Sequence, residues 1–309
     1  MTEKPLVSVI INCYNSEKYL RETIDSLVAQ TYENWEAIFW DNCSTDKTAE
    51  IITSYKEARF RYFLAEKNTP LGEARNLAME KIQGKYFCFL DSDDVWAEDF
   101  LFKAVTVLLQ DIKIVCFFSN YYDWKGNRKK AHNKNCISGE RTFKDMVRNY
   151  GVGMSSALLR SNVAKQNDIH FNSNYQLVED LDFFLKMSRK GLFYYEATPL
   201  NLYRIHPNSY SFKQLEGWEE EYNHVYNELK KIYISGGGNL LEEKDIKWIR
   251  NRAIACRLEF LMMQNRKREL LRTLLFEKEL PIRYWSRIFF VLLGKGLFVK
   301  MKAIKERLL

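Results

Sequence analysis

The chain has 309 residues, of which 46% are hydrophobic and 28% are charged, with few Pro and Gly residues. A chain of this length and composition can bury a sizeable core in one or two domains, which excludes a disordered or fibrous protein. Its net charge of +7 is uneven, because residues 281–309 carry seven basic side chains against one acid. The rest of the chain is almost neutral, and we therefore expect no nucleic acid as a partner.

The six cysteines form no Cys-x-x-Cys pair and show no spacing typical of metal ligands. Several lie inside apolar runs, so we expect buried thiols in a reducing compartment. No apolar run reaches the roughly 20 residues that span a bilayer. Residues 1–5 lead directly into a predicted strand, and we expect no signal peptide. The sequence therefore predicts a cytoplasmic protein.

Strands and helices alternate through the first half of the chain. Residues 6–11 are rich in β-branched side chains, a pattern typical of a strand buried on both faces of a parallel sheet. Leu20, Ile24 and Leu27 then recur on one face of a helix. The same patterns predict strands at 35–40, 61–64 and 86–90, and helices at 48–56 and from Pro70 to a stop at Gly84. Repeated units of this kind predict an α/β, Rossmann-like fold with a mostly parallel sheet flanked by helices.

The pattern changes after a predicted helix at 98–110 and a predicted strand at 112–119. Residues 120–140 are polar and aromatic around a Gly126-Asn127 turn, and predict a hairpin or loop over the ligand crevice. A strand at 154–159 and a helix at 178–189 follow, and the chain reads as helical from about residue 213. We therefore predict two domains, a catalytic domain at 1–212 and a C-terminal helical extension at 213–309.

The tetrapeptide Asp91-Ser92-Asp93-Asp94 follows the predicted strand at 86–90 directly. Ligands of parallel α/β sheets bind beyond the carboxyl ends of the strands, where Asp41 also lies. Carboxylates so placed suit Mg²⁺ or Mn²⁺, which are bound by one or two carboxylates together with substrate phosphates. The alternative is a solvated turn that caps the next helix, since Asp and Ser favour both positions.

Six segments of the chain carry polar residues in a specific order and spacing. They are Val7–Asn15, Asp41–Asp46, Gly72–Asn76, Leu90–Asp94, Glu179-Asp180 and Tyr203–His206. Taken in order, these segments resemble those of family-2 glycosyltransferases with a GT-A fold, and the resemblance covers about residues 5–210. It implies an inverting, metal-dependent transfer of a sugar from a nucleotide-sugar donor, as in bacterial surface-polysaccharide assembly.

The resemblance places Tyr14, Asp41 and Asn42 around the base of the donor. The family usually has Asp-Asp-Gly where this chain has Asp41-Asn42-Cys43. An Asn carbonyl accepts the imide N–H of uracil more weakly than a carboxylate does. Cys also tolerates the positive φ of the usual glycine poorly. A UDP-sugar is the expected donor. Residues 41–46 can alternatively serve only to cap the second predicted helix.

The resemblance also assigns the residues around the diphosphate. Arg75 is expected near the diphosphate, since a planar guanidinium suits phosphate oxygens. Asp91 is expected to contact the ribose and Asp93 to bind Mn²⁺ or Mg²⁺, while Asp94 caps the following helix. His206 matches a family position that often reaches the metal or the diphosphate. Read without the resemblance, Arg75 and His206 are ordinary surface or core residues.

The catalytic base of the family corresponds to Asp180. Glu179-Asp180 is predicted to open a helix, where the N-terminal dipole favours the ionised carboxylate that a general base must be. Glu179 is expected to be structural or to bind the acceptor, which is a glycan or a lipid-linked oligosaccharide. Without the resemblance, both residues are simply first-turn acids.

Two rival functions remain open from the sequence. A sugar-phosphate nucleotidyltransferase uses a related crevice, but it needs a Gly-rich, basic segment after the first strand, where this chain has Asn12-Cys13-Tyr14-Asn15. A non-catalytic module that binds nucleotide-sugars or carbohydrates is the other alternative.

The basic C-terminal segment suggests a membrane surface as a further partner. Trp285, Ile288, Phe289 and Leu292 lie at helical spacing among Lys and Arg residues. Basic amphipathic segments rich in Trp and Phe can lie in the interface of an anionic membrane. We therefore expect peripheral association with the inner face of the cell membrane, the alternative being a helix packed on the catalytic domain.

Overall fold

The structure is a computed structural model that describes residues 4–206, 217–236 and 240–276. The chain divides into two compact units, residues 1–206 and 207–309, each of which is described by itself. The predicted domain boundary at residue 212 lies outside the described residues, as does the basic segment at 281–309.

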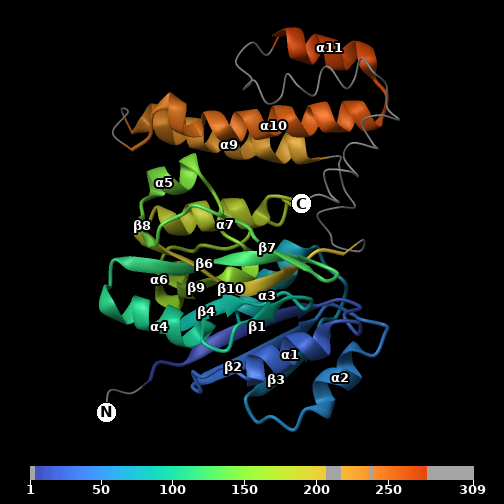
Figure 1. The fold of residues 1–309 in the computed structure, drawn as a ribbon, viewed down its shortest axis with the longest axis vertical. Coiled ribbons are helices and arrows are strands. Elements are labelled where there is room, and N and C mark those ends of the chain that lie inside the picture. Colours follow the sequence, from blue (N-terminus) through green and yellow to red (C-terminus); the bar gives the residue numbers. More distant parts are fainter. Residues whose placement is uncertain (1–3, 207–216, 237–239, 277–309) are drawn as a thin grey trace. The chain divides into compact units, whose positions relative to one another are not determined.

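The first unit is built on a ten-stranded sheet (Figure 1). Eight strands follow the order β3-β2-β1-β4-β9-β6-β10-β5, while β7 pairs with β6 and β8 pairs with β10. The strands β1 to β4 run parallel, β9 runs antiparallel between β4 and β6, and β10 runs parallel to β6. The expected α/β fold with a mostly parallel sheet is confirmed. The strands are β1 (Val7–Cys13), β2 (Trp35–Asp41), β3 (Phe60–Leu64), β4 (Tyr86–Phe89), β5 (Val95–Trp96), β6 (Ile114–Lys125), β7 (Arg128–Ala131), β8 (Gly139–Arg141), β9 (Ala157–Arg160) and β10 (Leu192–Arg204).

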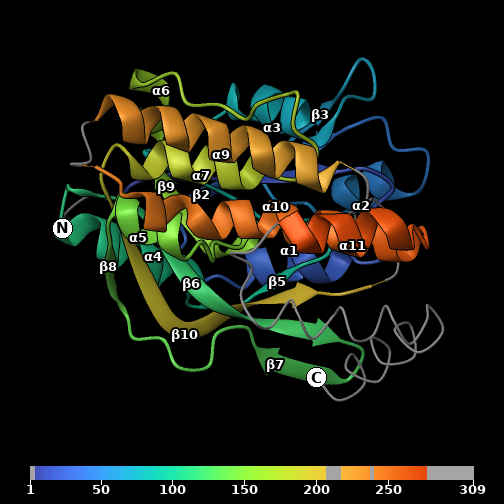
Figure 2. The ribbon, with the colours of Figure 1, turned by 90° about the horizontal axis from the view of Figure 1, so that it is seen from above.

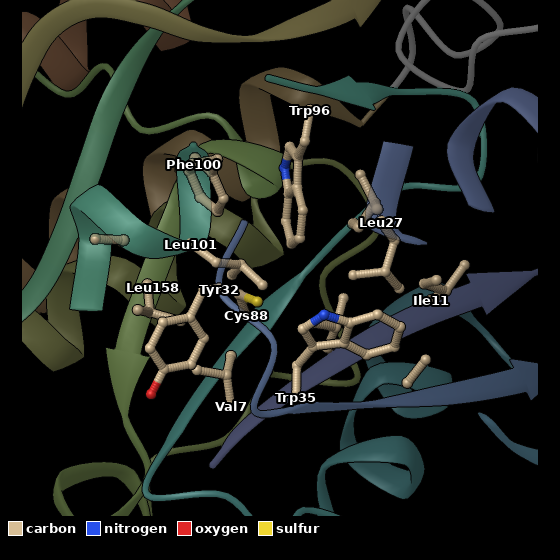
Figure 3. Close-up of a cluster of buried hydrophobic side chains, with 14 of the residues drawn as sticks. Val7, Ile11, Leu27, Tyr32, Trp35, Cys88, Trp96, Phe100, Leu101 and Leu158 are labelled. Carbon is tan, nitrogen blue, oxygen red and sulfur yellow. The ribbon is translucent and has the colours of Figure 1, made fainter. Parts of the chain in front are cut away.

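Alternate side chains of each central strand point to opposite faces of the sheet, and both faces are covered by helices. Val9 and Ile11 of β1 belong to one apolar cluster together with residues of α1 (Leu20–Val28), α2 (Thr48–Ser54) and α4 (Phe100–Gln110). Figure 3 shows part of this cluster, with Trp35 between Val7 and Leu27. Burial on both faces explains why the strands read as almost continuous apolar runs.

The opposite face carries α3 (Leu71–Met79) and α7 (Glu179–Ser188). Phe89 of β4 meets Phe171 and Phe183 edge-to-face, with ring centroids 5.4 and 6.5 Å away, and the latter two rings stack at 4.2 Å. Edge-to-face and offset-stacked pairs are the favourable arrangements of aromatic rings. This aromatic cluster fixes α7 against the sheet, and the first turn of α7 carries Asp180, the predicted catalytic base. The shorter helices of the unit are α5 (Phe143–Arg148), α6 (Ser161–Gln166) and the 3₁₀ turn Met154–Ser156.

Several strands differ from the sequence prediction. The strand predicted at 154–159 begins only at Ala157, as β9, because Met154–Ser156 form a 3₁₀ turn. The strand predicted at 112–119 continues as β6 to Lys125, turns at Gly126-Asn127 and pairs with β7, so the expected hairpin is present (Figure 2). The strand β10, from Leu192 to Arg204, was not predicted. Polar, aromatic and apolar residues do not alternate clearly along β10, so its sequence lacks the usual signal of a strand. The strand pairs with three other strands, and its register with β6 is irregular.

The second unit is helical in the residues that the structure describes. It contains α9 (Trp218–Ser235), α10 (Glu243–Met263) and α11 (Lys267–Phe276). Buried Leu258, Leu261 and Met262 of α10 pack with Leu270 of α11. Within the described ranges, none of the helices combines the length and the apolar character needed to cross a membrane.

Candidate active site

The acidic tetrapeptide at 91–94 forms the loop after β4, at the carboxyl edge of the sheet. The backbone N–H of Asp91 donates a hydrogen bond to Ser155 Oγ at 3.0 Å. The backbone carbonyl of Asp93 accepts a hydrogen bond from Arg204 Nε at 2.8 Å. The loop is thus held between the segment before β9 and the end of β10, which are far from it in sequence.

Asp94 is a buried anchor of this loop, with 1% of its surface exposed. Its carboxylate accepts hydrogen bonds from Ser155 Oγ at 2.6 Å and from the backbone N–H of Arg204 at 2.9 Å. Burial raises the pKa of the Asp94 carboxyl, and the neighbouring acids of the loop raise it further. The expectation that Asp94 caps the next helix is wrong, because α4 starts after Asp99.

Asp93, in the loop after β4, lies beside His206, which follows the end of β10. Asp93 Oδ2 and His206 Nε2 are 2.8 Å apart, and the two side chains are 31% and 14% exposed. A carboxylate oxygen and an imidazole nitrogen are suitable ligands for Mn²⁺. Within the described ranges, no group of three His, Cys, Asp or Glu side chains is placed to hold a metal ion. The pair therefore fits a metal that completes its coordination with substrate phosphates and water.

Arg75 lies between the loop that contains Asp91 and the first turn of α7, and it is only 5% exposed. Its Nη1 donates to Glu179 Oε1 at 2.9 Å, and its Nη2 lies 3.5 Å from Asp91 Oδ1. The guanidinium carbon is 5.9 and 5.4 Å from the ring centroids of Phe89 and Phe171. Arg75 thus joins the loop after β4 to the first turn of α7. Two nitrogen atoms of the guanidinium group therefore already contact carboxylates of the protein itself.

Asp180 is placed on this same side of the sheet by the first turn of α7. Its Oδ1 accepts a hydrogen bond from the backbone N–H of Leu181 at 2.7 Å, and its Oδ2 accepts one from Tyr150 Oη at 3.3 Å. Burial raises the pKa of the Asp180 carboxyl, while the positive charge of Arg75 and these hydrogen bonds oppose the increase. A carboxylate with a raised pKa is a stronger base, which suits proton abstraction near neutral pH.

The residues expected around the donor base lie at the ends of β1 and β2. Asp41 is 1% exposed, and its two oxygens accept hydrogen bonds from the Ser44 N–H and the Tyr62 hydroxyl, both at 2.8 Å. Asn42 Nδ2 donates to the Thr69 carbonyl at 2.7 Å, and its Oδ1 accepts from the Thr69 N–H at 3.1 Å. Both side chains therefore hold loops together, with their polar atoms already paired.

In the same region, Tyr14 is exposed and Cys43 is half-buried. Tyr14 is 57% exposed, so its ring is available for stacking. Cys43 adopts φ +67°, the left-handed conformation that the usual glycine adopts without strain, and its Sγ lies 3.2 Å from the Ala65 carbonyl. The turn therefore forms with a cysteine in the place of the glycine. The loop also helps to begin α2, because Asp46 Oδ1 accepts a hydrogen bond from the Thr48 N–H at 2.9 Å.

Two residues that support the site, Tyr150 and Ser155, belong to no motif of the sequence. Both lie before β9, and Ser155 is part of the 3₁₀ turn Met154–Ser156. Arg204 lies in the Tyr203–His206 segment, two residues before the predicted metal ligand His206, but its contacts depend on the unpredicted strand β10. Its guanidinium carbon lies 4.4 and 3.9 Å from the ring centroids of Tyr19 and Trp124, so it is clamped between α1 and β6.

A mostly parallel sheet, an acidic loop at its carboxyl edge and a second acid at the start of a facing helix define a glycosyltransferase of the GT-A fold. Comparison with known families matches residues 8–167 to glycosyl transferase family 2. The chain belongs to this family, as the resemblance implied.

Relatives of known name support this assignment. The chain is 30% identical over 235 residues to the putative teichuronic acid biosynthesis glycosyltransferase TuaG of Bacillus subtilis, covering 75% of this chain and 91% of that protein. It is 28% identical over 244 residues to WfgD of Escherichia coli, named a UDP-Glc:alpha-D-GlcNAc-diphosphoundecaprenol beta-1,3-glucosyltransferase, covering 74% of this chain and 90% of that protein.

Solved structures share the fold. S. aureus TarS 1-349 in complex with UDP-GlcNAc aligns with a TM-score of 0.65 at 20% identity, over 90% of this chain and 82% of that chain. The mannosyltransferase PcManGT of Pyrobaculum calidifontis in complex with GDP-Man and Mn²⁺ aligns with a TM-score of 0.57 at 17% identity, over 96% of this chain and 87% of that chain. At these identities the likeness concerns the fold alone.

Proposed function

We propose that this glycosyltransferase moves a sugar from a UDP-sugar to a hydroxyl of a glycan or lipid-linked acceptor, with inversion of the anomeric centre, in bacterial polysaccharide assembly. The observation that carries the proposal is the position of Arg75, which joins the Asp91 loop to the helix start that carries Asp180. This contact supports a common site for the donor and the proposed catalytic base. The names of TuaG and WfgD supply the class of acceptor.

In this proposal Asp180 is the general base. One of its oxygens removes the proton of the acceptor hydroxyl as the hydroxyl oxygen forms a bond to the anomeric carbon from the side opposite the nucleotide. The bond from that carbon to the diphosphate oxygen breaks, and the nucleoside diphosphate leaves with the electron pair. Tyr150 and the Leu181 N–H orient the Asp180 carboxylate through their hydrogen bonds, so that it keeps one geometry.

Asp93 and His206 are the proposed ligands of Mn²⁺ or Mg²⁺. Such an ion acts as a Lewis acid that stabilises the charge developing on the departing diphosphate. Arg204 fixes the backbone of Asp93, since its Nε donates to the Asp93 carbonyl at 2.8 Å. Asp91 is proposed to contact the ribose, and Arg75 to hold Asp91 in place beside the diphosphate.

We propose different roles for Tyr14, Asp41 and Asn42 in binding the base of the donor. Asp41 and Asn42 shape the pocket through their buried hydrogen bonds, and the exposed ring of Tyr14 stacks on the base. A pocket shaped by backbone and by an aromatic ring distinguishes bases through size and backbone hydrogen bonds. A thermal-shift screen of UDP-, GDP- and CDP-sugars with Mn²⁺ tests this, because a donor at a hundredfold excess over Kd stabilises the protein by about 2.7 kcal/mol.

The catalytic assignment is tested with Asp180→Asn. We expect sugar transfer to disappear while UDP-sugar affinity, measured by calorimetry, remains within about threefold of the wild type. Asp182→Asn is the matched control, because Asp182 lies on the same helix turn and pairs with Lys186 at 2.6 Å. Loss of donor binding in Asp180→Asn, or retained transfer, removes Asp180 from the role of base.

The metal assignment is tested with Asp93→Ala. We expect the Mn²⁺-dependent part of UDP affinity to be lost, since one of the two protein ligands is removed. Asp99→Ala is the control, because Asp99 is an exposed acid that pairs with Lys103 on α4. Equal affinities of Asp93→Ala with and without Mn²⁺ agree with the proposal, whereas an unchanged Mn²⁺ effect contradicts it.

We also propose peripheral association with the inner face of the cell membrane. The support is the basic, aromatic composition of residues 281–309 and the lipid-linked substrate in the name of WfgD. Deletion of 281–309 is expected to release the enzyme from vesicles that contain anionic lipid. An unchanged fraction bound to these vesicles overturns this part of the proposal.

A further inference from the structure

The β6–β7 hairpin carries an aromatic group that the mechanism does not use. Tyr121 of β6 stacks on His132, which follows β7, with ring centroids 4.4 Å apart and planes 24° from parallel. Both oxygens of Asp123 lie 3.2 Å from His132 Nδ1 and hold the imidazole in place. The edge of Tyr203 on β10 meets the Tyr121 ring at 5.9 Å. Figure 2 shows this hairpin beside β10.

The Tyr121 ring also packs closely against the segment that contacts both ends of the active site. A Cβ added at Gly153 would lie 3.1 Å from Tyr121 Cε1, tighter than ordinary van der Waals contact, so glycine allows this approach. On one side of Gly153, Tyr150 donates to Asp180 at 3.3 Å. On the other side, Ser155 donates to Asp94 at 2.6 Å. Tyr121 is therefore packed beside the proposed base and the acidic loop.

We propose that Tyr121 determines acceptor specificity by donating a hydrogen bond from its hydroxyl to a hydroxyl of the acceptor sugar, while His132 and Asp123 hold its ring. The proposal rests on the proposed function, because it places the acceptor beside Asp180. The ligand class is a hexose or N-acetylhexosamine at the end of the acceptor. Such a sugar presents hydroxyl oxygens that a neutral phenol can bind.

Two observations support a free donor at this position. In the described part of the chain, the Tyr121 hydroxyl makes no hydrogen bond, and the residue is half-buried. Burial raises the pKa of Tyr121, and the negative charges of Asp123, Asp180 and Asp94 raise it further. The phenol therefore stays protonated at neutral pH. A half-buried hydroxyl that makes no hydrogen bond within the protein is available to donate one, and a bound sugar offers hydroxyl oxygens as acceptors.

Tyr121→Phe removes this hydroxyl and keeps the ring. With UDP-glucose or UDP-GlcNAc as donor and GlcNAc-diphosphoundecaprenol as acceptor, we expect the acceptor KM to rise about three- to tenfold, the effect of one neutral hydrogen bond. Donor Kd and the rate of donor hydrolysis by water are expected to stay within twofold of wild type. Tyr122→Phe is the matched control, since successive side chains of a strand point to opposite faces.

A second variant tests the support of the ring. His132→Gln removes the stacked imidazole, and we expect it to raise the acceptor KM in the same direction without changing donor Kd. An acceptor KM of Tyr121→Phe within twofold of Tyr122→Phe overturns the inference, as does a parallel loss of donor affinity. The Asp180→Asn variant tests the proposed function separately. If the proposed function is wrong, this variant still transfers sugar or no longer binds the donor, whatever the result for Tyr121→Phe.

Discussion

The pair formed by Arg75 and Glu179 should contribute more to stability than any exposed ion pair of the first unit. The Arg75 and Glu179 side chains are 6% and 8% exposed, and Arg75 Nη1 lies 2.9 Å from Glu179 Oε1. Glu179→Leu leaves Arg75 with only the 3.5 Å contact to Asp91 among the ion pairs of the described residues. Its Nε already has no hydrogen-bond partner in that part of the chain. The substitution thus creates a buried charge with poor compensation.

Removal of one partner from a buried pair costs about 3–5 kcal/mol. A typical domain is stable by about 5–15 kcal/mol, so Glu179→Leu should remain folded with a clearly lower urea midpoint. Arg75→Met combined with Glu179→Leu removes both charges, and the double variant should recover about 2 kcal/mol relative to the sum of the two single changes. The coupling is positive because each single variant leaves one charge buried.

The assay is urea unfolding of the four proteins of this cycle, followed by circular dichroism. A second cycle on Asp99 and Lys103 is the control, because these side chains are 43% and 39% exposed. Exposed helical pairs of this kind couple by about 0.3–0.5 kcal/mol. Equal coupling energies in the two cycles would refute the reasoning that burial, rather than the contact alone, makes the Arg75 pair strong.

Four further predictions concern single residues. Cys43→Gly should be more stable than Cys43→Ala by about 1 kcal/mol, because φ is +67° there; a more stable alanine variant in thermal unfolding contradicts this. Asp94→Ala should lower the free energy of unfolding by about 1–3 kcal/mol, since Ser155 and an N–H lose their acceptor; a change under about 0.5 kcal/mol, usual for surface sites, argues against the anchor. As the pH is lowered, the transfer rate should fall at a pH above the pKa of an ordinary carboxyl, because the pKa of Asp180 is raised. A transfer rate that does not change between neutral pH and pH 4 contradicts this prediction. The native state therefore binds this proton more tightly than the unfolded chain, so the stability linked to Asp180 is present at low pH and lost as pH rises through the raised pKa. Asp180→Asn should accordingly raise Tm more at pH 8 than at pH 5, and equal gains oppose this.

The central strands and the helices that follow them were predictable from local patterns. Residues 6–11 and 86–90 are apolar enough that only a strand covered on both faces explains them, and β1 and β4 lie there. The helix predicted at 178–189 is α7. In contrast, β10 escaped prediction because its partners lie far away in sequence and its register is irregular. A strand of this kind is stabilised by its neighbours rather than by its own alternation.

The place of several candidate residues at the carboxyl ends of strands was predictable, but their partners were not. The expectation for Asp94 failed since a short polar residue before a helix is typical of a cap, whereas the buried hydroxyl of Ser155 binds it instead. Asn42 was expected to meet the base, and its amide is paired with Thr69. In both cases the competing partner belongs to a segment that sequence spacing cannot bring close.

The sequence by itself determined the class of fold, the family and the edge of the sheet where the acids gather. The fold class and the sheet edge follow from hydrophobic periodicity and from acids at the carboxyl ends of strands, which are local properties of the chain. The family follows from the resemblance of six ordered segments to those of family-2 glycosyltransferases. Only the tertiary structure decided that Arg75 pairs with Glu179 and Asp93 with His206, residues 104 and 113 positions apart. Charges so distant along the chain meet through packing of α3, α7 and β10 on one sheet, and no local pattern encodes that packing.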